Sequence, residues 1–453
     1  MVSFGVVLFY VSVFFFFLFS MFMEFREQLY WVVFYFFFFL VFFLKFFFVS
    51  SETFFSCHFG FLHMDGMSVV FIFLSIWVCV LSFLSMFFDE YSDYLMLSFL
   101  SSFLFFLLVF FFGSGNVFFF FCLFELTLFP VFYVVVMWGS YKERVFSLYY
   151  FLLFTIITSI PLLLVVCSML YMGFFNYLFL FMNSFFFYVF PSFLLLGLLL
   201  GFLSKLPLFG FHMWLPKAHV DAPVGGSMLL AGILLKLGGY GVLRLFLLFN
   251  YQVVVFLLFF LVFVGILGYF FSALICVRLL DLKVIIAFSS VSHMSVAFSG
   301  SVGGAFWGFK GAFLMFLGHG IVSPLLFYMV HLVSKFFNSR YIMGIKGFAS
   351  LYFWLSLFFF FFLLFNMGVP PFINFFAEVG IMYSIFLVSF PLFFFVFLGF
   401  LFNGLYIFSL LGVFLQSKVF LSKSFDVIFL NGFVFFSGFL LIVYMTFFLD
   451  FFL

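Results

Sequence analysis

The sequence has very little charge. Only 7% of its 453 residues are charged, whereas 69% are hydrophobic and 106 are phenylalanine. Soluble domains carry about a quarter charged residues, so this composition cannot cover a water-facing surface. We therefore predict an all-α integral membrane protein whose solvent is lipid. We interpret the phenylalanine excess as the product of a T-rich genome, such as that of an organelle.

Several kinds of binding site are also missing. The five cysteines lie far apart with no C-x-x-C pair, which argues against a disulfide framework and an iron–sulfur cluster. No nucleotide-binding glycine motif is present, and sixteen scattered basic residues form no nucleic-acid patch. Cys57, His58, His63 and Asp65 share one segment but lack the tight spacing of metal ligands. We expect no cofactor, metal, nucleotide or nucleic acid in this chain.

What the sequence does have is a series of apolar segments long enough to cross a bilayer. A helix needs about 20 apolar residues to cross a core of about 30 Å. Two stretches, 176–216 and 349–390, would each reach about 62 Å as one straight helix, and both are interrupted, by Pro207 and by Pro370 and Pro371 respectively. The other predicted spans lie near 2–23, 29–49, 68–88, 95–112, 117–138, 145–171, 226–249, 252–274, 284–303, 310–333, 393–415 and 428–449.

The distribution of basic residues decides whether each long stretch crosses once or twice. Single, broken crossings give fourteen spans, with eleven basic residues on one face and only Lys45, Arg244 and Lys310 on the other. Double crossings would divide the same residues seven to seven. We therefore predict fourteen transmembrane helices with helices 7 and 12 broken, and both termini on the face away from the matrix or cytoplasm. The eleven are Arg26, Lys142, Arg144, Lys217, Arg278, Lys283, Lys335, Arg340, Lys346, Lys418 and Lys423.

Two broken helices at corresponding positions indicate a duplicated unit with a transport site. Spans 4–8 and 9–13 would form two five-helix repeats, which insert with inverted topology because five is odd. The predicted division is residues 1–94 for helices 1–3, 95–249 for the first antiporter-like repeat, 250–416 for the second, and 417–453 for helix 14.

Four ionisable residues lie well inside predicted spans: Glu125, Lys205, Lys236 and Glu378. A charge at a helix centre costs about 2.5–3.5 kcal/mol, so such residues face the bundle interior and typically mark a pathway. Burial lowers the pKa of a lysine and raises that of a glutamate, so both types can exchange protons near neutral pH. The prolines in the two long stretches would free carbonyls and admit water at mid-membrane depth. We predict a proton route; the alternative is a structural ion pair between helices.

Histidines extend this line. His293 and His319 lie inside neighbouring spans and are candidate relay members, or else donors in helix–helix hydrogen bonds. His212 and His219 lie near the loop end of span 7. They are either proton entry groups or polar residues at the membrane interface.

The sequence also resembles a known family. The stretch KLPLFGFHMWLPKAHVDAPVGGSMLLAGILLKLGGYGVLRL at 205–245 is similar to the signature of the chain 4 family of NADH:ubiquinone oxidoreductase, respiratory complex I. The segments FELTLFP at 124–130, ICVRLLDLKVIIAFSSVSHMS at 275–295 and GHGIVSPLLF at 318–327 match in the same order. The similarity covers about residues 117–390.

The resemblance implies an antiporter-like subunit of the membrane arm, multi-pass in the mitochondrial inner membrane, with both termini on the intermembrane-space side. Such a subunit translocates protons, driven by quinone reduction elsewhere in the complex, and its partners are other membrane-arm subunits, including antiporter-like ones. The family's helix 5 glutamate, helix 7 and helix 8 lysines and helix 12 acid fall on Glu125, Lys205, Lys236 and Glu378. Related pump subunits carry lysine at the last position, so Glu378 favours chain 4.

Two other functions are compatible with parts of the pattern. A Mrp-type sodium/proton antiporter subunit shares the pumping residues, although the 205–245 block and Glu378 favour complex I. A haem-carrying electron carrier would need histidines on facing helices at matched depth, and only His293 and His319 qualify. A visible absorption spectrum distinguishes the haem protein from the other two.

Overall fold

The computed structural model describes residues 57–59, 62–88, 93–171, 192–248, 255–415 and 428–447. Apart from a hairpin of β1 (Cys57–Phe59) and antiparallel β2 (Leu62–Met64), the regular secondary structure of these residues is helical. Within them, nine helices are long and apolar enough to cross a membrane. The predicted all-α membrane fold is confirmed. The predicted spans 2–23 and 29–49 lie outside the described residues, so the total of fourteen stays a prediction.

The chain divides into two compact units. Unit 1 is Met1–Gly201 with Asp221–Ile233, and unit 2 is Phe202–Val220 with Leu234–Leu453. The helices of unit 1 are α3 (Gly66–Phe88), α4 (Tyr94–Phe112), α5 (Val117–Leu126), α6 (Leu128–Trp138), α7 (Arg144–Tyr171), most of α8 (Ser192–Lys205) and α10 (Val224–Leu229). Those of unit 2 include α9 (Trp214–Asp221), α11 (Leu235–Leu248), α12 (Val255–Arg278), α13 (Leu282–Val302), α14 (Phe306–Phe337), α15 (Phe348–Leu351), α16 (Phe353–Met367), α17 (Ile373–Val388), α18 (Phe390–Leu415) and α19 (Ile428–Phe447). The predicted repeat boundaries stay a prediction.

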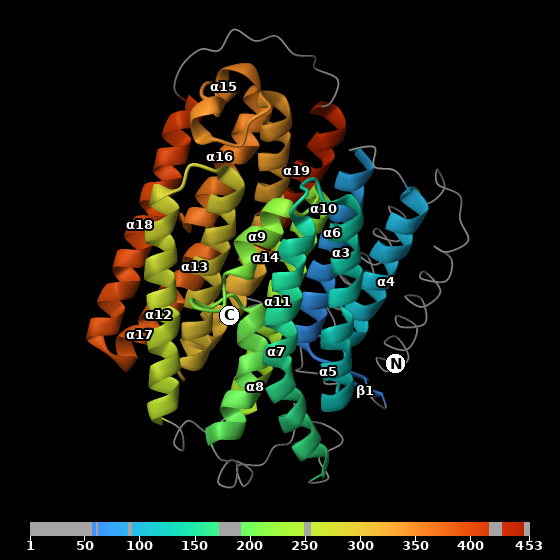
Figure 1. Ribbon diagram of the computed structural model, residues 1–453. Coiled ribbons are helices and arrows are strands. Elements are labelled where there is room, and N and C mark those ends of the chain that lie inside the picture. The colour runs from blue at the N-terminus through green and yellow to red at the C-terminus, as the bar shows by residue number, and fades with distance from the viewer. Residues whose placement is uncertain are drawn as a thin grey trace. The chain divides into compact units, whose positions relative to one another are not determined.

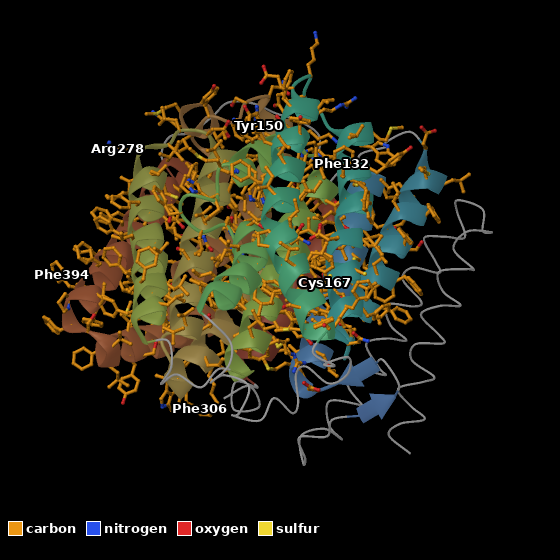
Figure 2. The ribbon with its side chains drawn as sticks, turned by 60° about the horizontal axis from the view of Figure 1, so that its bottom comes forward. Phe132, Tyr150, Cys167, Arg278, Phe306 and Phe394 are labelled. Atoms are coloured by element: carbon orange, nitrogen blue, oxygen red, sulfur yellow. The ribbon has the colours of Figure 1, made fainter. Side chains whose placement is uncertain are left out.

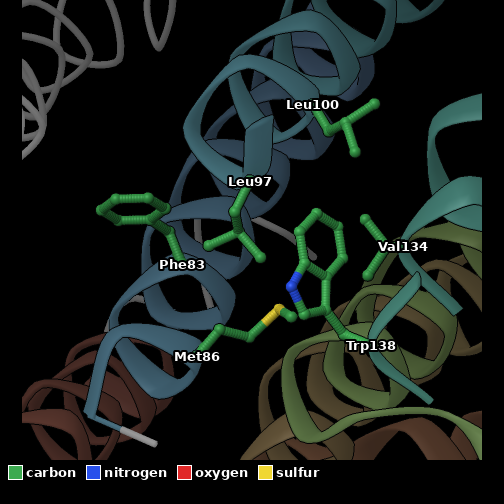
Figure 3. Close-up of a cluster of buried hydrophobic side chains, with 6 residues drawn as sticks. All are labelled: Phe83, Met86, Leu97, Leu100, Val134 and Trp138. Atoms are coloured by element: carbon green, nitrogen blue, oxygen red, sulfur yellow. The ribbon is translucent and has the colours of Figure 1, made fainter. Parts of the chain in front are cut away.

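Unit 1 is held together by interlocking apolar side chains. Figure 3 shows the indole of Trp138, on α6, surrounded by side chains from α3 and α4. Lipid is as apolar as these side chains, so close packing rather than escape from water drives helix association here. The cluster consists of Phe83, Met86, Leu97, Leu100, Val134 and Trp138.

Unit 2 is built around two long, buried helices. α13 packs against α12 and α14, α14 packs against α17, and α12 packs against α18 (Figure 1). α13 carries six buried serines, and each hydroxyl donates to the carbonyl three residues earlier, as Ser292 does to Ser289 at 2.7 Å. These bonds satisfy the hydroxyl donors without a partner helix, so a polar helix can lie in the apolar interior.

Both long stretches are broken where the prolines predict. α8 ends at Lys205 and α9 begins at Trp214, with Pro207 between them; α16 ends at Met367 and α17 begins at Ile373, across Pro370 and Pro371. Proline has no N–H to donate and crowds the preceding turn, so neither helix continues through these residues. The predicted breaks in helices 7 and 12 are confirmed.

The outer surface of the helices carries large apolar side chains. Phe394 of α18 and Phe306 of α14 are 54% and 66% exposed and point away from the ribbon (Figure 2). A water-soluble protein rarely exposes large contiguous apolar patches. These helices instead present the surface that a hydrocarbon environment requires.

Candidate functional site

Lys236 is fully buried in α11 and lies beside a histidine. Its side chain has 0% exposure, and its Nζ is 2.9 Å from Nδ1 of His319 on α14. The five residues Leu230–Leu234, directly before α11, form a π-helical turn. Such turns are rare and are often found at functional sites. The lysine therefore stands directly after an irregularity of its own helix, in contact with a group that can exchange protons with it.

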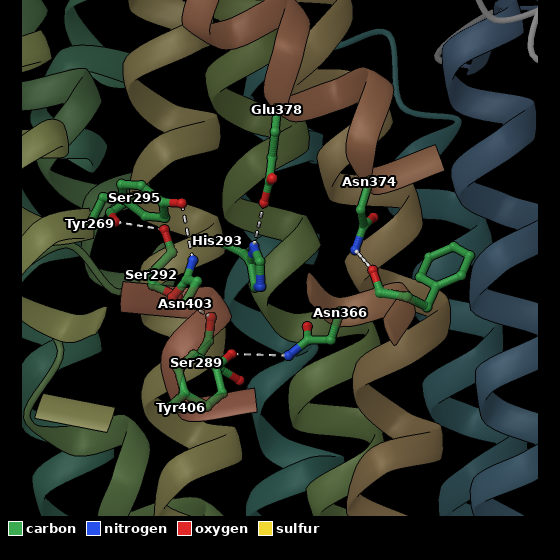
Figure 4. A network of polar contacts seen from close by, with 11 residues as sticks. Tyr269, Ser289, Ser292, His293, Ser295, Asn366, Asn374, Glu378, Asn403 and Tyr406 are labelled. Carbon is green, nitrogen blue, oxygen red and sulfur yellow. Dashed lines mark hydrogen bonds and ion pairs between the residues drawn. The ribbon is translucent and has the colours of Figure 1, made fainter. Parts of the chain in front are cut away.

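The line continues from His319 to two further helices. The ring centroids of His319 and His293 are 5.8 Å apart, which brings α14 and α13 together through their imidazoles. Nδ1 of His293 lies 3.7 Å from Oε1 of Glu378 on α17 (Figure 4). Lys236, His319, His293 and Glu378 thus form a continuous row, which we call the central row. Sequence separations of tens of residues are closed by packing within unit 2.

Glu378 ends the central row at the second helix break. Its side chain is 3% exposed, and neither carboxylate oxygen has a hydrogen-bond partner among the described residues. A Cβ on Gly368 would come within 2.7 Å of Oε2, so the carboxyl group lies against the break between α16 and α17. Helical side chains point toward the N-terminus of their helix, which explains why Glu378 reaches back to this break.

The central row has the chemistry of a proton relay. Imidazole can accept a proton at one nitrogen and release one at the other, and it does so near neutral pH in its unperturbed state. The two histidines stand between a group that carries a proton as a cation and a group that carries one as a neutral acid. A buried charge without a partner is costly. If a proton moved along the row, the charge would move from one member to the next.

Lys205 comes to the same part of unit 2 from another helix. It is the last residue of α8 and is 2% exposed. A Cβ on Gly238 of α11 would lie 3.0 Å from the Phe202 carbonyl oxygen and 2.9 Å from the Leu206 nitrogen. The ends of α8 and the start of α11 therefore touch, so Lys205 and Lys236 belong to segments in contact. The last carbonyls of a helix favour a cation at this position.

Glu125 lies in α5 of unit 1. Its side chain is partly buried, and its Oε1 has no hydrogen-bond partner among the described residues. Lys205 belongs to unit 2. The predicted action of Glu125 on Lys205 therefore stays a prediction.

The two candidate entry histidines differ in their surroundings. His212 lies in the first helix break, where its Nδ1 accepts a hydrogen bond from the Gly210 N–H at 3.2 Å. His219 on α9 is fully buried, stacks on Phe327 at 4.6 Å, and has no hydrogen-bond partner for either nitrogen among the described residues. Both rings are buried within the protein, and the choice between an entry group and an interfacial residue stays a prediction. Next to His219, Lys283 Nζ lies 3.4 Å from the Val220 carbonyl oxygen.

A second layer of polar groups, not predicted from the sequence, surrounds Glu378 and His293. Asn403 donates to the Tyr269 hydroxyl at 3.0 Å, and Asn366 donates to the Tyr406 hydroxyl at 3.3 Å (Figure 4). Asn374, one turn before Glu378, donates to the Phe365 carbonyl at 3.1 Å. The available signal was asparagine inside apolar spans, where an amide needs a buried partner. The missed residues are Tyr269, Asn366, Asn374, Asn403 and Tyr406.

A further basic residue is buried in the second half of α11. Arg244, one of the three basic residues assigned to the sparsely charged face, is 3% exposed, and its Nη2 donates to the Tyr240 hydroxyl at 2.8 Å. The guanidinium also lies over the Tyr240 ring, 4.9 Å from its centroid. Aromatic contact and hydrogen bonding offset the cost of burying this charge. In the described part of the chain, no three His, Cys, Asp or Glu side chains gather as a metal site.

These observations define a polytopic membrane protein with a buried row of ionisable side chains that crosses several helices. The chain belongs to the family described as NADH:quinone oxidoreductase/Mrp antiporter, transmembrane part, whose model matches residues 114–404. The resemblance predicted from the 205–245 block is thereby confirmed.

Individual relatives and a solved structure agree with this assignment. NADH-ubiquinone oxidoreductase chain 4 of Lumbricus terrestris is 39% identical over 278 residues, which cover 61% of each chain. The chain 4 protein of Ceratitis capitata is 36% identical over 341 residues, or 72% of each chain. The match thus spans about three-fifths of the length of the Lumbricus relative. A chain of respiratory complex I from Thermus thermophilus has the same fold, with a TM-score of 0.81 at 21% identity over 98% of this chain and 95% of that one.

Proposed function

We propose that this chain moves protons across its membrane through the central row. The observation that carries the proposal is the pair of close contacts at its two ends, Lys236 to His319 at 2.9 Å and His293 to Glu378 at 3.7 Å. A purely structural ion pair would need one cation and one anion in direct contact. Here two imidazoles separate the lysine from the glutamate, an arrangement that suits stepwise proton transfer.

The transfer has three steps within unit 2. A proton on Lys236 Nζ passes to Nδ1 of His319, then between the two imidazoles, then from His293 to the carboxylate of Glu378. Moving one elementary charge against 100 mV takes about 2.3 kcal/mol. A change of one pKa unit is worth about 1.4 kcal/mol. A change of about two units at a single buried group is therefore enough to drive a proton against such a potential.

We place this transport in the membrane arm of NADH:ubiquinone oxidoreductase in the mitochondrial inner membrane. The support is the name shared by the curated relatives at 36–39% identity. Quinone reduction elsewhere in the complex would supply the energy, and other membrane-arm subunits, including antiporter-like ones, would be the partners. The proposal assigns no redox group to this chain.

A Mrp-type sodium/proton antiporter subunit is the second candidate, because the family description includes both kinds of protein. The chain 4 relatives and the acid at Glu378 favour the oxidoreductase. Identification of the chains that co-purify with this one separates the two, since only the first would bring quinone-reducing subunits with it.

Protons would reach the row through groups at the first helix break. His219 is fully buried, and Nζ of Lys283, at the start of α13, lies 3.4 Å from the carbonyl oxygen of the next residue, Val220. His212 lies in the break itself. Lys205, with Glu125 modulating it, would gate this supply.

Replacement of Lys236 by arginine tests the proposal. Arginine keeps the positive charge and its hydrogen-bonding capacity but does not release its proton. Lys236→Arg complex reconstituted in vesicles should assemble and lose more than about 90% of its proton uptake, as expected for a group that must be deprotonated in each cycle. Normal uptake per quinone reduced would show that Lys236 has a structural role only.

The proposed orientation has its own test. If fourteen spans place both termini on the intermembrane-space side, the loop at 335–346 must lie on the opposite face from the N-terminus. Accessibility of an inserted protease site in that loop, compared with an N-terminal tag, measures this directly. Cleavage of both from the same side would contradict the orientation.

A further inference from the structure

Tyr269 on α12 is a buried phenol that no step of the proposed transfer uses. Its side chain is 1% exposed, and its hydroxyl accepts a hydrogen bond from Nδ2 of Asn403 on α18 at 3.0 Å. Figure 4 places this pair beside His293 and Glu378. Two apolar helices thus bring one hydroxyl and one amide into the neighbourhood of the central row.

α18 is shaped to receive this tyrosine. Gly399 lies one turn before Asn403, on the same face of α18. A Cβ at Gly399 would collide with the Tyr269 ring, where even the third-nearest atom, Cζ, is only 3.3 Å away. The glycine makes room for the ring and the asparagine binds the hydroxyl. Together they fix the position of the phenol.

The bond from Asn403 also determines what the hydroxyl can do. Because the amide N–H occupies a lone pair of the phenolic oxygen, the hydrogen of the phenol is directed toward another acceptor. Both carboxylate oxygens of Glu378 lack a hydrogen-bond partner among the described residues, and this carboxylate acts electrostatically on Tyr269. A buried carboxylate needs donors to remain ionised. The phenol can supply one through a bridging water.

We propose that Tyr269, held by Asn403 and Gly399, is a positioning residue for Glu378: its hydroxyl donates toward the carboxylate and sets how readily Glu378 releases its proton. This inference rests on the proposed role of Glu378 in proton transfer. It adds a group from α12 and α18 to a row that otherwise runs through α11, α14, α13 and α17.

Other groups also face Glu378 and enter the same equilibrium. α13 contributes His293 at 3.7 Å, and α14 contributes His319 behind it. α16 contributes Asn366, which does not titrate, and α18 contributes Tyr406. The Tyr406 hydroxyl accepts a hydrogen bond from Nδ2 of Asn366 at 3.3 Å. Tyr406 is thus a buried, amide-bound phenol like Tyr269, which makes it the matched control.

The test is the pH profile of quinone-coupled proton uptake by assembled complex carrying Tyr269→Phe. Loss of the donor leaves the carboxylate less stabilised, so Glu378 holds its proton to a higher pH. The alkaline half-maximum should move up by about one pH unit, the size expected for one hydrogen bond to a charged group. Tyr406→Phe removes a buried, amide-bound hydroxyl of the same kind and should shift the half-maximum by clearly less, because the inference assigns the donated hydrogen bond to Tyr269 alone.

Further variants keep the outcomes distinct. Asn403→Leu releases the phenol and should shift the profile in the same direction, and it decides the question if Tyr269→Phe fails to assemble. An unchanged profile in Tyr269→Phe, or an equal shift in Tyr406→Phe, overturns the inference about Tyr269. If Glu378→Gln abolishes proton uptake in the same assay, the proposed function still stands. Wild-type uptake in Glu378→Gln overturns the proposed function as well.

Discussion

The two helix breaks of unit 2 each lie against an ionisable group, but they meet it differently. Lys205 is the last residue of α8, directly before the first break, and the C-terminal end of a helix favours a cation. Glu378 is the sixth residue of α17, beyond its first turn, and reaches the second break only through its side chain, which lies against Gly368. The first break therefore acts on its residue through the helix end, whereas the second provides room for a carboxyl group.

Each break is also pinned by one side-chain hydrogen bond. Trp214, the first residue of α9, donates its Nε1–H to the Ser204 carbonyl at 3.0 Å. Asn374, the second residue of α17, donates to the Phe365 carbonyl at 3.1 Å. A carbonyl freed at a helix end must find a donor in a membrane interior. In both breaks the second half-helix supplies that donor, so the two halves are held in register.

Replacement of Lys205 is expected to have the largest effect. Lys205→Arg keeps a cation at the end of α8 but cannot release a proton, so proton uptake should fall by more than about tenfold while assembly is retained. Lys205→Ala removes the cation as well and should lower both proton uptake and assembly of the complex. If Lys205→Arg retains full proton uptake, the lysine only complements the partial charge of the helix end and takes no part in proton transfer.

Four glycines among the described residues have a positive φ, and two of them lie in the helix breaks. Gly368 (φ 74°) lies in the second break, where a Cβ would meet the Glu378 carboxyl group, whereas nothing lies within 4 Å of a Cβ at Gly210 (φ 104°) in the first break. Alanine at either position should cost about 1–2 kcal/mol of backbone strain. Gly368→Ala should in addition displace the Glu378 carboxyl and reduce uptake several-fold. Thermal unfolding and vesicle assays of both variants test this. Equal proton uptake in the Gly368 and Gly210 variants would contradict a role for the contact between Gly368 and Glu378.

The pinning bonds are expected to give the smallest effects. Asn374→Leu leaves the Phe365 carbonyl without its donor, and Trp214→Phe does the same to Ser204. Each should lower stability by about 1–3 kcal/mol, the cost of one unsatisfied buried acceptor. The melting temperature of the assembled complex measures the loss. No change in either variant would mean that the breaks are held by packing alone.

Much of this architecture could be predicted from the sequence because lipid imposes few choices. Apolar length predicted the bounds of α3, α4, α7, α12, α13, α14 and α18 to within about four residues, and Pro207, Pro370 and Pro371 predicted both breaks. It did not predict the division of 117–138 into α5 and α6 or the π-helical turn before α11. The rarity of charge singled out Lys236 and Glu378, since a buried charge in an apolar span has almost no alternative to an interior position. Both are in fact buried in unit 2.

The parts that escaped prediction depend on contacts between distant segments. Tyr269 and Asn403 are 134 residues apart, and nothing in either helix reveals which partner its polar group meets. Phenylalanine occupies so many positions that it obscures the helical periodicity from which buried faces are inferred.

The most direct test of the proton route compares the two breaks in one assay. Complexes carrying Lys205→Ala, Glu378→Ala or both are reconstituted in vesicles, and proton uptake is measured per quinone reduced. The account predicts reduced uptake in each single variant, and no further loss in the double variant because both residues belong to one route. Wild-type stoichiometry and rate in both single variants would contradict it.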